Sequence, residues 1–397
     1  MPFGFQQLRR SGVAATVALG ALILAGSGAQ AHSPDGVANS DYLYVPNRAS
    51  ADITIIDTST DQVIGKVGVG NVPHQVAVSA SAGALVASNT KDNSLSIIDL
   101  DTQQTVATLI LDSEPEHMQL SPDGMTLAVG NIAAGTVSLI DLAQNVETAR
   151  IDGFFQPHNL TWNNEGSLLF AANLGANHIS VVDTAKAEII REIPVGDPQM
   201  VAYRGDAADA DFQGLINVTR SIDGKLGFAA HGESGQMAVI DLDSGELRKN
   251  LSVGERPWRA FATPDGKFML IPRNGDKTVA VVDAATQETI AVLPGAADMT
   301  GVNTDPTGRF AYVISRGDHK LVVLDLAQMR SHGEIALGGS PETGVTAPGS
   351  GKLYVALSSS NQVAVIDTAT ATLTGTIDRV GEEPWGAYMV GAANYCH

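Results

Sequence analysis

Short apolar runs that end in aspartate recur along the whole chain, and polar turn residues separate them. The first of these runs is ITIID, within ITIIDTSTDQ at residues 53–62. The closing aspartates of the eight copies are Asp57, Asp99, Asp141, Asp183, Asp241, Asp283, Asp325 and Asp367. Neighbouring copies are 42 residues apart, except for one interval of 58 residues between Asp183 and Asp241. A fixed period of this size predicts a repeat architecture.

Each repeat contains four β-rich runs with turn-forming clusters between them. In the first repeat these runs are YLYVPN, ITIID, VIGKVGV and HQVAVS. Runs such as ISVVD are apolar at consecutive positions, whereas a helical repeat would need apolar residues three and four positions apart. Strands that are apolar on both sides fit a sheet packed between two neighbouring sheets. Four strands in a unit of about 40 residues therefore predict one blade of a β-propeller.

The order of the runs predicts how the ring closes. The first run starts at Tyr42 and corresponds to the second strand of a blade, and the last run, WGAYMV at 385–390, corresponds to a first strand. When the last segment completes the first blade, no sheet edge stays unpaired. We therefore expect an all-β fold, an eight-bladed β-propeller with four antiparallel strands per blade and one-plus-three ring closure.

Segments such as LYVPN…ITIIDT, LFAAN…ISVVDT and LYVAL…VAVIDT resemble the repeats of the YVTN family of β-propellers. The resemblance covers residues 42–390 and implies the propeller fold, which hosts many different activities. The chain also resembles, more distantly, the propellers of periplasmic nitrite and nitrous oxide reductases and those of lactonases and lyases.

Residues 1–31 have the pattern of a secretory signal peptide. Arg9 and Arg10 precede an apolar run that ends in AQA, a small-residue cleavage signal. We therefore expect a protein of the periplasm or a secreted protein, exported by ordinary secretion or, given the arginine pair, by the twin-arginine route. Cleavage leaves residues 32–41 as a flexible N-terminal segment, residues 42–397 as a single β-propeller domain, and no membrane span.

Acidic residues outnumber basic ones, and the formal net charge of the chain is −19. Loss of Arg9 and Arg10 with the signal peptide changes this charge to −21. Such a charge repels phosphate backbones and anionic lipids. The expected partners are therefore a small-molecule ligand or a periplasmic protein, and not nucleic acid. The single cysteine, Cys396, excludes an internal disulfide.

The recurring aspartates have a structural interpretation. Each one ends a strand and begins a turn, where its carboxylate accepts hydrogen bonds from nearby backbone N–H groups. Eight carboxylates in equivalent turns around a ring do not converge on one substrate. Functional residues are therefore expected where the repeat varies, in the loops of one face.

The residue that begins the first strand of each blade lies at one mouth of the central channel. Its identity varies around the ring: His74, His117, His158, Gln199, Trp258, Met299, Glu342 with Thr343, and Trp385. Three consecutive blades thus carry histidine, and we call His74, His117 and His158 the rim histidines. Three imidazoles from adjacent blades predict a site for copper, iron or zinc with an open coordination position. The alternative interpretation is a polar lining of a water-filled channel.

Further candidate residues are expected on the same face. His231 ends a second strand there and could supply a fourth ligand. Trp258 and Trp385 suit an amphipathic or planar ligand, or they plug the channel. The interval of 58 residues exceeds the period of 42 by 16. The resulting loop, 199–214, which begins at Gln199, could act as a lid.

The two chain ends form a second candidate metal site. Cleavage after AQA makes His32 the new N-terminus, and the chain ends in Cys396 and His397. Both ends flank the closing blade, on the face opposite the rim histidines. A terminal amine, two imidazoles and a thiolate are ligands for copper or zinc, although frayed chain ends are the common alternative.

Several catalytic motifs are absent from the sequence. It has no CxxCH haem-attachment motif, no phosphate-binding glycine loop and no nucleophile elbow. This excludes a covalent c-type haem and leaves no signature of a serine hydrolase. The leading hypothesis is a binding protein that uses the rim histidines and the loop 199–214 to hold a small ligand, a cofactor or a protein partner.

Two enzymatic hypotheses stay open beside it. In the first, the rim histidines are copper or iron ligands of a redox metalloenzyme, as the resemblance to the reductase propellers implies. In the second, Glu116, Glu342 and His231 are acid–base groups of a lactonase- or lyase-like enzyme.

Overall fold

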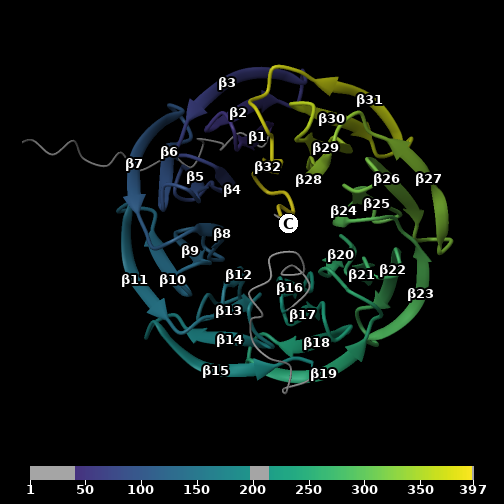
Figure 1. Ribbon diagram of the computed structural model, residues 1–397, viewed down its shortest axis with the longest axis horizontal. Helices are drawn as coiled ribbons and strands as arrows, with labels where there is room; N and C mark the ends of the chain where they lie inside the picture. The colour runs from purple at the N-terminus through teal and green to yellow at the C-terminus, as the bar shows by residue number, and fades with distance from the viewer. Residues whose placement is uncertain (1–40, 197–213, 396–397) are drawn as a thin grey trace, which may run out of the picture. The chain divides into compact units, whose positions relative to one another are not determined.

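The computed structural model describes residues 41–196 and 214–395, and the strands in this part of the chain belong to one compact unit, residues 37–397. Eight four-stranded antiparallel sheets follow one another around a central axis (Figure 1). The expected all-β, eight-bladed β-propeller is therefore confirmed. No helix long and apolar enough to cross a membrane occurs among the described residues. The predicted signal peptide at 1–31 and residues 32–40 lie outside the described part of the chain.

The first four blades contain the strands β1 to β15 and the C-terminal strand β32. Blade 1 consists of β1 (Tyr42–Asn47), β2 (Asp52–Asp57), β3 (Gln62–Gly68) and β32 (Tyr388–Met389). Blade 2 consists of β4 (Pro73–Ser79), β5 (Ala84–Asn89), β6 (Ser94–Asp99) and β7 (Gln104–Ile110). Blade 3 consists of β8 (Pro115–Leu120), β9 (Thr126–Asn131), β10 (Thr136–Asp141) and β11 (Val146–Asp152). Blade 4 consists of β12 (Pro157–Trp162), β13 (Leu168–Asn173), β14 (His178–Asp183) and β15 (Glu188–Pro194).

The remaining blades repeat this order. Blade 5 consists of β16 (Thr219–Arg220), β17 (Leu226–His231), β18 (Gln236–Asp241) and β19 (Glu246–Ser252). Blade 6 consists of β20 (Phe261–Ala262), β21 (Phe268–Arg273), β22 (Thr278–Asp283) and β23 (Glu288–Pro294). Blade 7 consists of β24 (Met299–Thr304), β25 (Phe310–Ser315), β26 (Lys320–Asp325) and β27 (Arg330–Ala336). Blade 8 consists of β28 (Pro341–Thr346), β29 (Lys352–Leu357), β30 (Gln362–Asp367) and β31 (Thr372–Ile377).

The two ends of the propeller meet in blade 1. The C-terminal strand β32 pairs with β1 in antiparallel fashion, with Tyr388 opposite Tyr44. A further backbone bridge joins Pro384 to Asn47. The one-plus-three closure predicted from the order of the runs is therefore confirmed, and it covers the inner edge that β1 would otherwise expose.

The apolar core lies between neighbouring blades. All six residues of β5, for example, are buried. One core cluster joins Leu43 of blade 1 with Tyr354 and Val365 of blade 8. Because both faces of a blade meet another blade, the second and third strands are apolar at consecutive positions, which explains the runs seen in the sequence.

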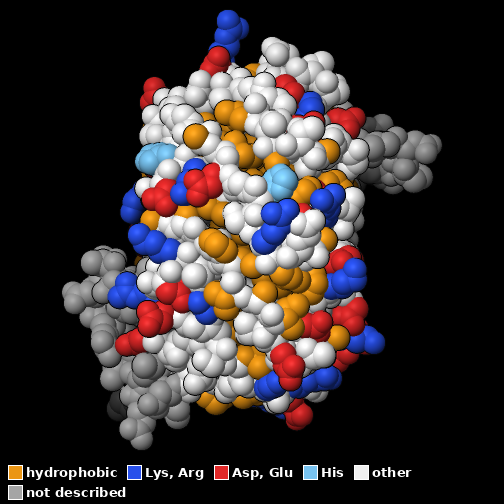
Figure 2. All heavy atoms as spheres, turned by 90° about the vertical axis from the view of Figure 1, so that its right-hand side faces the viewer, with side chains coloured by type: hydrophobic (Ala, Val, Ile, Leu, Met, Phe, Trp, Pro, Cys, Tyr) orange, Lys and Arg blue, Asp and Glu red, His pale blue; other side chains and the backbone are white. Residues whose placement is uncertain are grey.

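The fourth strand of each blade lies at the outer surface and alternates between more and less exposed side chains. In β3 only Val67 is buried. Ile290 and Val292 of β23 are 48% and 49% exposed. Figure 2 shows one side of the molecular surface, where hydrophobic side chains lie among charged side chains of both signs.

The recurring aspartates close turns, as expected. Asp57 accepts hydrogen bonds from the backbone N–H of Ser59 at 2.8 Å and from its hydroxyl at 2.6 Å. These bonds hold the pKa of Asp57 below its ordinary value. Asp367 accepts hydrogen bonds from the backbone N–H groups of Ala369 and Thr370 in the same way. The repeated carboxylates thus serve the turns of separate blades.

Candidate functional site

The three rim histidines converge at one mouth of the channel. The ring centroids of His74 and His117 are 5.1 Å apart with the rings nearly perpendicular, and those of His117 and His158 are 3.7 Å apart. All three side chains are buried, and His117 is fully inaccessible to solvent. Blades 2, 3 and 4 therefore bring three imidazoles into direct contact.

A shared irregularity of the first strand places these histidines. In blades 2, 3 and 4 the pairing of the first strand with the second shifts register just after a proline. The shifts fall between Pro73 and Val76, between Pro115 and Met118, and between Pro157 and Leu160. A bulge bends the strand and changes the direction of its side chains. The histidines lie within these bulges, at the point where the strands enter the channel.

Glu116 joins the cluster from the same bulge as His117. The candidate ligand atoms of His74, Glu116 and His117 all lie within 4.8 Å of one another. The carboxylate oxygen Oε2 of Glu116 is 3.7 Å from Nε2 of His117. From the sequence we expected Glu116 only as an acid–base group. Its position next to His117 in PEHM was the available signal, but only the bulge geometry brings both side chains to the same point.

His74 has the environment of a neutral ligand. Its side chain is buried, and neither ring nitrogen has a hydrogen-bond partner among the described residues. Burial and, to a smaller extent, the positive charge of Arg48 together lower the pKa of His74 to about 3. A buried imidazole without a partner costs free energy. It also keeps a nitrogen lone pair available for a metal ion at neutral pH.

His158 is oriented by the backbone of blade 5. Its Nδ1 lies 3.0 Å from the carbonyl oxygen of Ile216, which can only accept a hydrogen bond. This carbonyl favours the tautomer with the proton on Nδ1 and the lone pair on Nε2, although the side-chain amide nitrogen of Asn159 also lies 3.1 Å from Nδ1. Burial lowers the pKa of His158 to about 3, against the opposing effect of the Ile216 hydrogen bond, and the charge of Arg259 adds to the lowering. His158 is thus a second neutral imidazole, stacked on His117.

His231 has a different role from the rim histidines. Its Nε2 lies 2.9 Å from Oδ1 of Asn177, and its Nδ1 accepts a hydrogen bond from the backbone N–H of Ser234 at 3.0 Å. Burial lowers the pKa of His231 to about 4. Both ring nitrogens are used within the protein, so His231 links blades 4 and 5 and offers no nitrogen to a ligand in this arrangement.

The two rim tryptophans lie in different surroundings. The ring of Trp385 is 6.1 Å from that of His74, and the guanidinium of Arg48 lies 4.0 Å above the Trp385 ring. Trp258 instead packs in a small apolar cluster with Leu174 and Ile216. Trp385 and Arg48 therefore form one wall of the histidine cluster, while Trp258 supports the segment whose carbonyl orients His158.

Glu342 belongs to a separate polar network on blades 7 and 8. Its carboxylate accepts hydrogen bonds from the hydroxyl of Ser358 and from the guanidinium of Arg316. Burial raises the pKa of Glu342, although both partners oppose this effect. The remaining sequence candidates, Gln199, His32, Cys396 and His397, lie outside the described residues, as does the loop 199–214 apart from its last residue.

The fold and the channel mouth together define an eight-bladed β-propeller that carries three buried histidines and one half-buried carboxylate. The sequence model of the YNCE-like beta-propeller family matches residues 75–394, and the chain belongs to this family. The YVTN-type propeller expected from the repeats is consistent with this assignment. A comparison with curated proteins gave no match.

Solved structures with the same fold include several proteins of low sequence identity. The dihydro-heme d1 dehydrogenase NirN in complex with DHE has a TM-score of 0.73 and 14% identity, over 88% of this chain and 75% of that chain. Apo AztD from Citrobacter koseri has a TM-score of 0.67 and 14% identity, over 89% of this chain and 98% of that chain. Kuenenia stuttgartiensis hydrazine synthase has a TM-score of 0.56 and 24% identity, over 75% and 96% of the two chains. At these identities the similarities establish the fold.

Proposed function

We propose that this propeller is a binding protein that holds a divalent transition-metal ion at the channel mouth through His74, Glu116 and His117. The observation that carries the proposal is the approach of their three candidate ligand atoms to within 4.8 Å of one another. Ligand atoms on one ion lie about 3 to 3.5 Å apart when each is about 2.1 Å from the metal. The ligand atoms therefore need to approach one another by at most about 2 Å to surround an ion.

The chemistry of the ligand set supports this class of ion. Imidazole nitrogen suits zinc, copper, iron and nickel, and two imidazoles with one carboxylate leave coordination positions open. The ring of His158 contacts that of His117, which places a third imidazole beside the three proposed ligands. Trp385 and Arg48 close the other side of the cluster. A small-molecule co-ligand or a periplasmic protein partner would then complete the site.

The N-terminal sequence supports export. The arginine pair, apolar run and small-residue cleavage signal within residues 1–31 favour secretion to the periplasm or beyond.

A redox metalloenzyme is the second candidate function. Two histidines and one carboxylate with open positions also form the ligand set of non-haem iron sites. One protein of the same fold is named a dehydrogenase, and the similarity to it is consistent with this candidate. An absorption band or a redox reaction that depends on His74 would favour the enzyme over the binding protein.

The direct test is the metal content of the purified protein and its affinity for added Zn²⁺. We expect about one ion per chain and a loss of affinity of about 100-fold or more in His74→Ala and Glu116→Gln, because each variant removes a ligand. His332→Ala is the matched control, since His332 is an exposed histidine on the outer strand β27. Unchanged Zn²⁺ binding in both site variants would refute the proposed site.

A further inference from the structure

A positive charge lies beside the candidate metal site. Arg48 directly follows β1 in blade 1, and its guanidinium carbon lies 4.0 Å from the ring centroid of Trp385. The Trp385 ring in turn lies 6.1 Å from the ring of His74. The charge of Arg48 contributes to the low pKa of His74, so the guanidinium lies within electrostatic reach of the proposed ligands.

The charge of Arg48 is not offset by a carboxylate of the described residues. Its backbone N–H donates a hydrogen bond to the carbonyl oxygen of Glu383 at 3.0 Å, but its guanidinium forms no ion pair there, and Nε has no hydrogen-bond partner. Arg316 has the equivalent position after the second strand of blade 7. That arginine lies 2.7 Å from a carboxylate oxygen of Asp298 and 3.4 Å from one of Glu342. The repeat thus contains a paired and an unpaired arginine at the same place.

The contact with Trp385 orients Arg48 for a planar acceptor. A guanidinium over an aromatic face keeps its N–H groups at its edge, where they can donate to both oxygens of one anion. Arg48 and Trp385 are both only partly buried, so this pair is accessible from the rim. An arginine that is already held in position loses less conformational freedom when it binds an anion.

The charge balance of a metal-loaded site also favours an anion. A divalent ion brings two positive charges to a place where Glu116 supplies one negative charge and Arg48 a further positive charge. Imidazoles that bind a metal ion are neutral and offset none of this charge. An excess of positive charge beside buried side chains is costly unless an anion joins the site.

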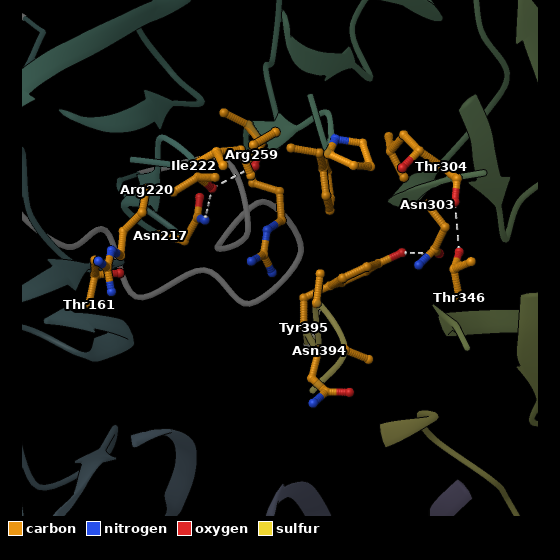
Figure 3. A pocket seen from close by; sticks show the side chains of 18 of the residues that line it. Thr161, Asn217, Arg220, Ile222, Arg259, Asn303, Thr304, Thr346, Asn394 and Tyr395 are labelled. Carbon is orange, nitrogen blue, oxygen red and sulfur yellow. Dashed lines mark hydrogen bonds between the residues drawn. The ribbon is translucent and has the colours of Figure 1, made fainter. Parts of the chain in front are cut away.

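The cavity inside the channel is a separate space. It has a volume of about 830 Å³, and Figure 3 shows part of its lining, where the hydroxyl of Tyr395 donates a hydrogen bond to Oδ1 of Asn303. Arg48, His74 and Trp385 are not among the described residues that line this cavity. A co-ligand of the metal is therefore expected at the rim and not in the cavity.

We propose that Arg48 and Trp385 form a subsite for a small carboxylate that binds as a co-ligand of the metal ion. This inference rests on the proposed metal site of His74, Glu116 and His117. One carboxylate oxygen takes an open coordination position of the ion, and the guanidinium of Arg48 donates hydrogen bonds to the carboxylate. A carboxylate is favoured over a spherical anion because its two coplanar oxygens match the planar guanidinium.

Acetate and acetamide are matched probes for this subsite, because they have nearly the same shape and only acetate is charged. The dissociation constant for Zn²⁺ is measured by calorimetry on the full chain in perchlorate, a weakly coordinating anion, and at equal ionic strength with each probe. After correction for acetate bound to free Zn²⁺, saturating acetate should tighten Zn²⁺ binding about tenfold or more, as expected for charge-assisted hydrogen bonds. Acetamide should change it by less than about twofold.

Arg48→Met should reduce the effect of acetate to less than about twofold, because the variant has no guanidinium to hold the anion. Its binding of Zn²⁺ in perchlorate checks that the variant is folded. Arg330→Met removes the same charge from the outer strand β27 and should keep the full effect of acetate.

Two kinds of failure are distinguishable. Equal effects of acetate and acetamide on the wild-type protein, or an undiminished effect of acetate in Arg48→Met, would overturn the carboxylate subsite alone. The metal site would still stand if His74→Ala loses affinity for Zn²⁺. Unchanged Zn²⁺ binding in His74→Ala and Glu116→Gln would refute the metal site and the carboxylate subsite with it.

Discussion

The imidazole rings of His117 and His158 lie 3.7 Å apart between their centroids and are tilted by 37°. Two imidazoles at this separation are stable while both are neutral, because two positive rings in contact within a buried site would repel each other strongly. Burial lowers the pKa of His158 to about 3, so the pair remains compatible with neutral pH. Burial thus keeps His158, like His74, in the neutral state that leaves a nitrogen lone pair for a metal ion.

The affinity for Zn²⁺ should depend only weakly on pH. His74 has a pKa of about 3 in the folded protein, so protons do not compete for its nitrogens between about pH 7.5 and pH 5.5. We expect the dissociation constant, measured by calorimetry in this range, to change by less than about threefold. A ligand with the ordinary histidine pKa of about 6.5 would instead lose about tenfold in affinity across it, and such a loss would contradict the neutral cluster.

Removal of the positive charge of Arg48 should strengthen metal binding. This charge contributes to the low pKa of His74, and a charge that disfavours a proton also disfavours a metal cation. We expect Arg48→Met to lower the dissociation constant for Zn²⁺ about fivefold at low ionic strength, measured without added carboxylate. Arg330→Met, on the outer strand β27, is the control. Weaker binding in Arg48→Met under these conditions would contradict this electrostatic argument.

The buried His231 should make the folded state sensitive to acid. Its pKa is lowered to about 4, so between about pH 6.5 and pH 4 the unfolded chain binds the proton and the folded protein does not. Stability therefore falls as the pH falls through this window. From about pH 7 to pH 5, the wild-type protein should lose about 2 kcal/mol more unfolding free energy than His231→Gln. Urea titrations of both proteins at these pH values measure the difference, and parallel losses would contradict the assignment.

Much of the fold was predictable because it is encoded locally and repeated. A strand such as ITIID, apolar at consecutive positions and closed by Asp57, recurs at a period of 42 residues. Each copy has the same apolar pattern because each packs between two neighbouring blades. The closure was predictable for the same reason, since the segment around Tyr388 has the pattern of a first strand and β1 lacks one. A single short apolar run could be a strand or part of a helix, but eight copies with the same spacing identify it as a strand of a repeat.

The site was predictable only in part. The sequence indicated that the rim histidines share one face, and the structure places them in contact. From the amino-acid sequence it was not possible to decide that Glu116 approaches His74, or that both ring nitrogens of His231 are hydrogen-bonded within the protein. These outcomes depend on bulges at the strand starts and on neighbours such as Asn177, which are far away in the chain.

The repeat pattern by itself determined the architecture, the number of blades and the strand that closes the ring, because strand and turn preferences act over a few neighbouring residues. Only the tertiary structure decided which side chains meet at each end of the channel, including the position of Tyr395 beside Arg259 and Asn303. A shift of one residue at the start of a strand redirects a side chain without altering the apolar pattern, and for that reason the contacts inside the channel cannot be read from the pattern.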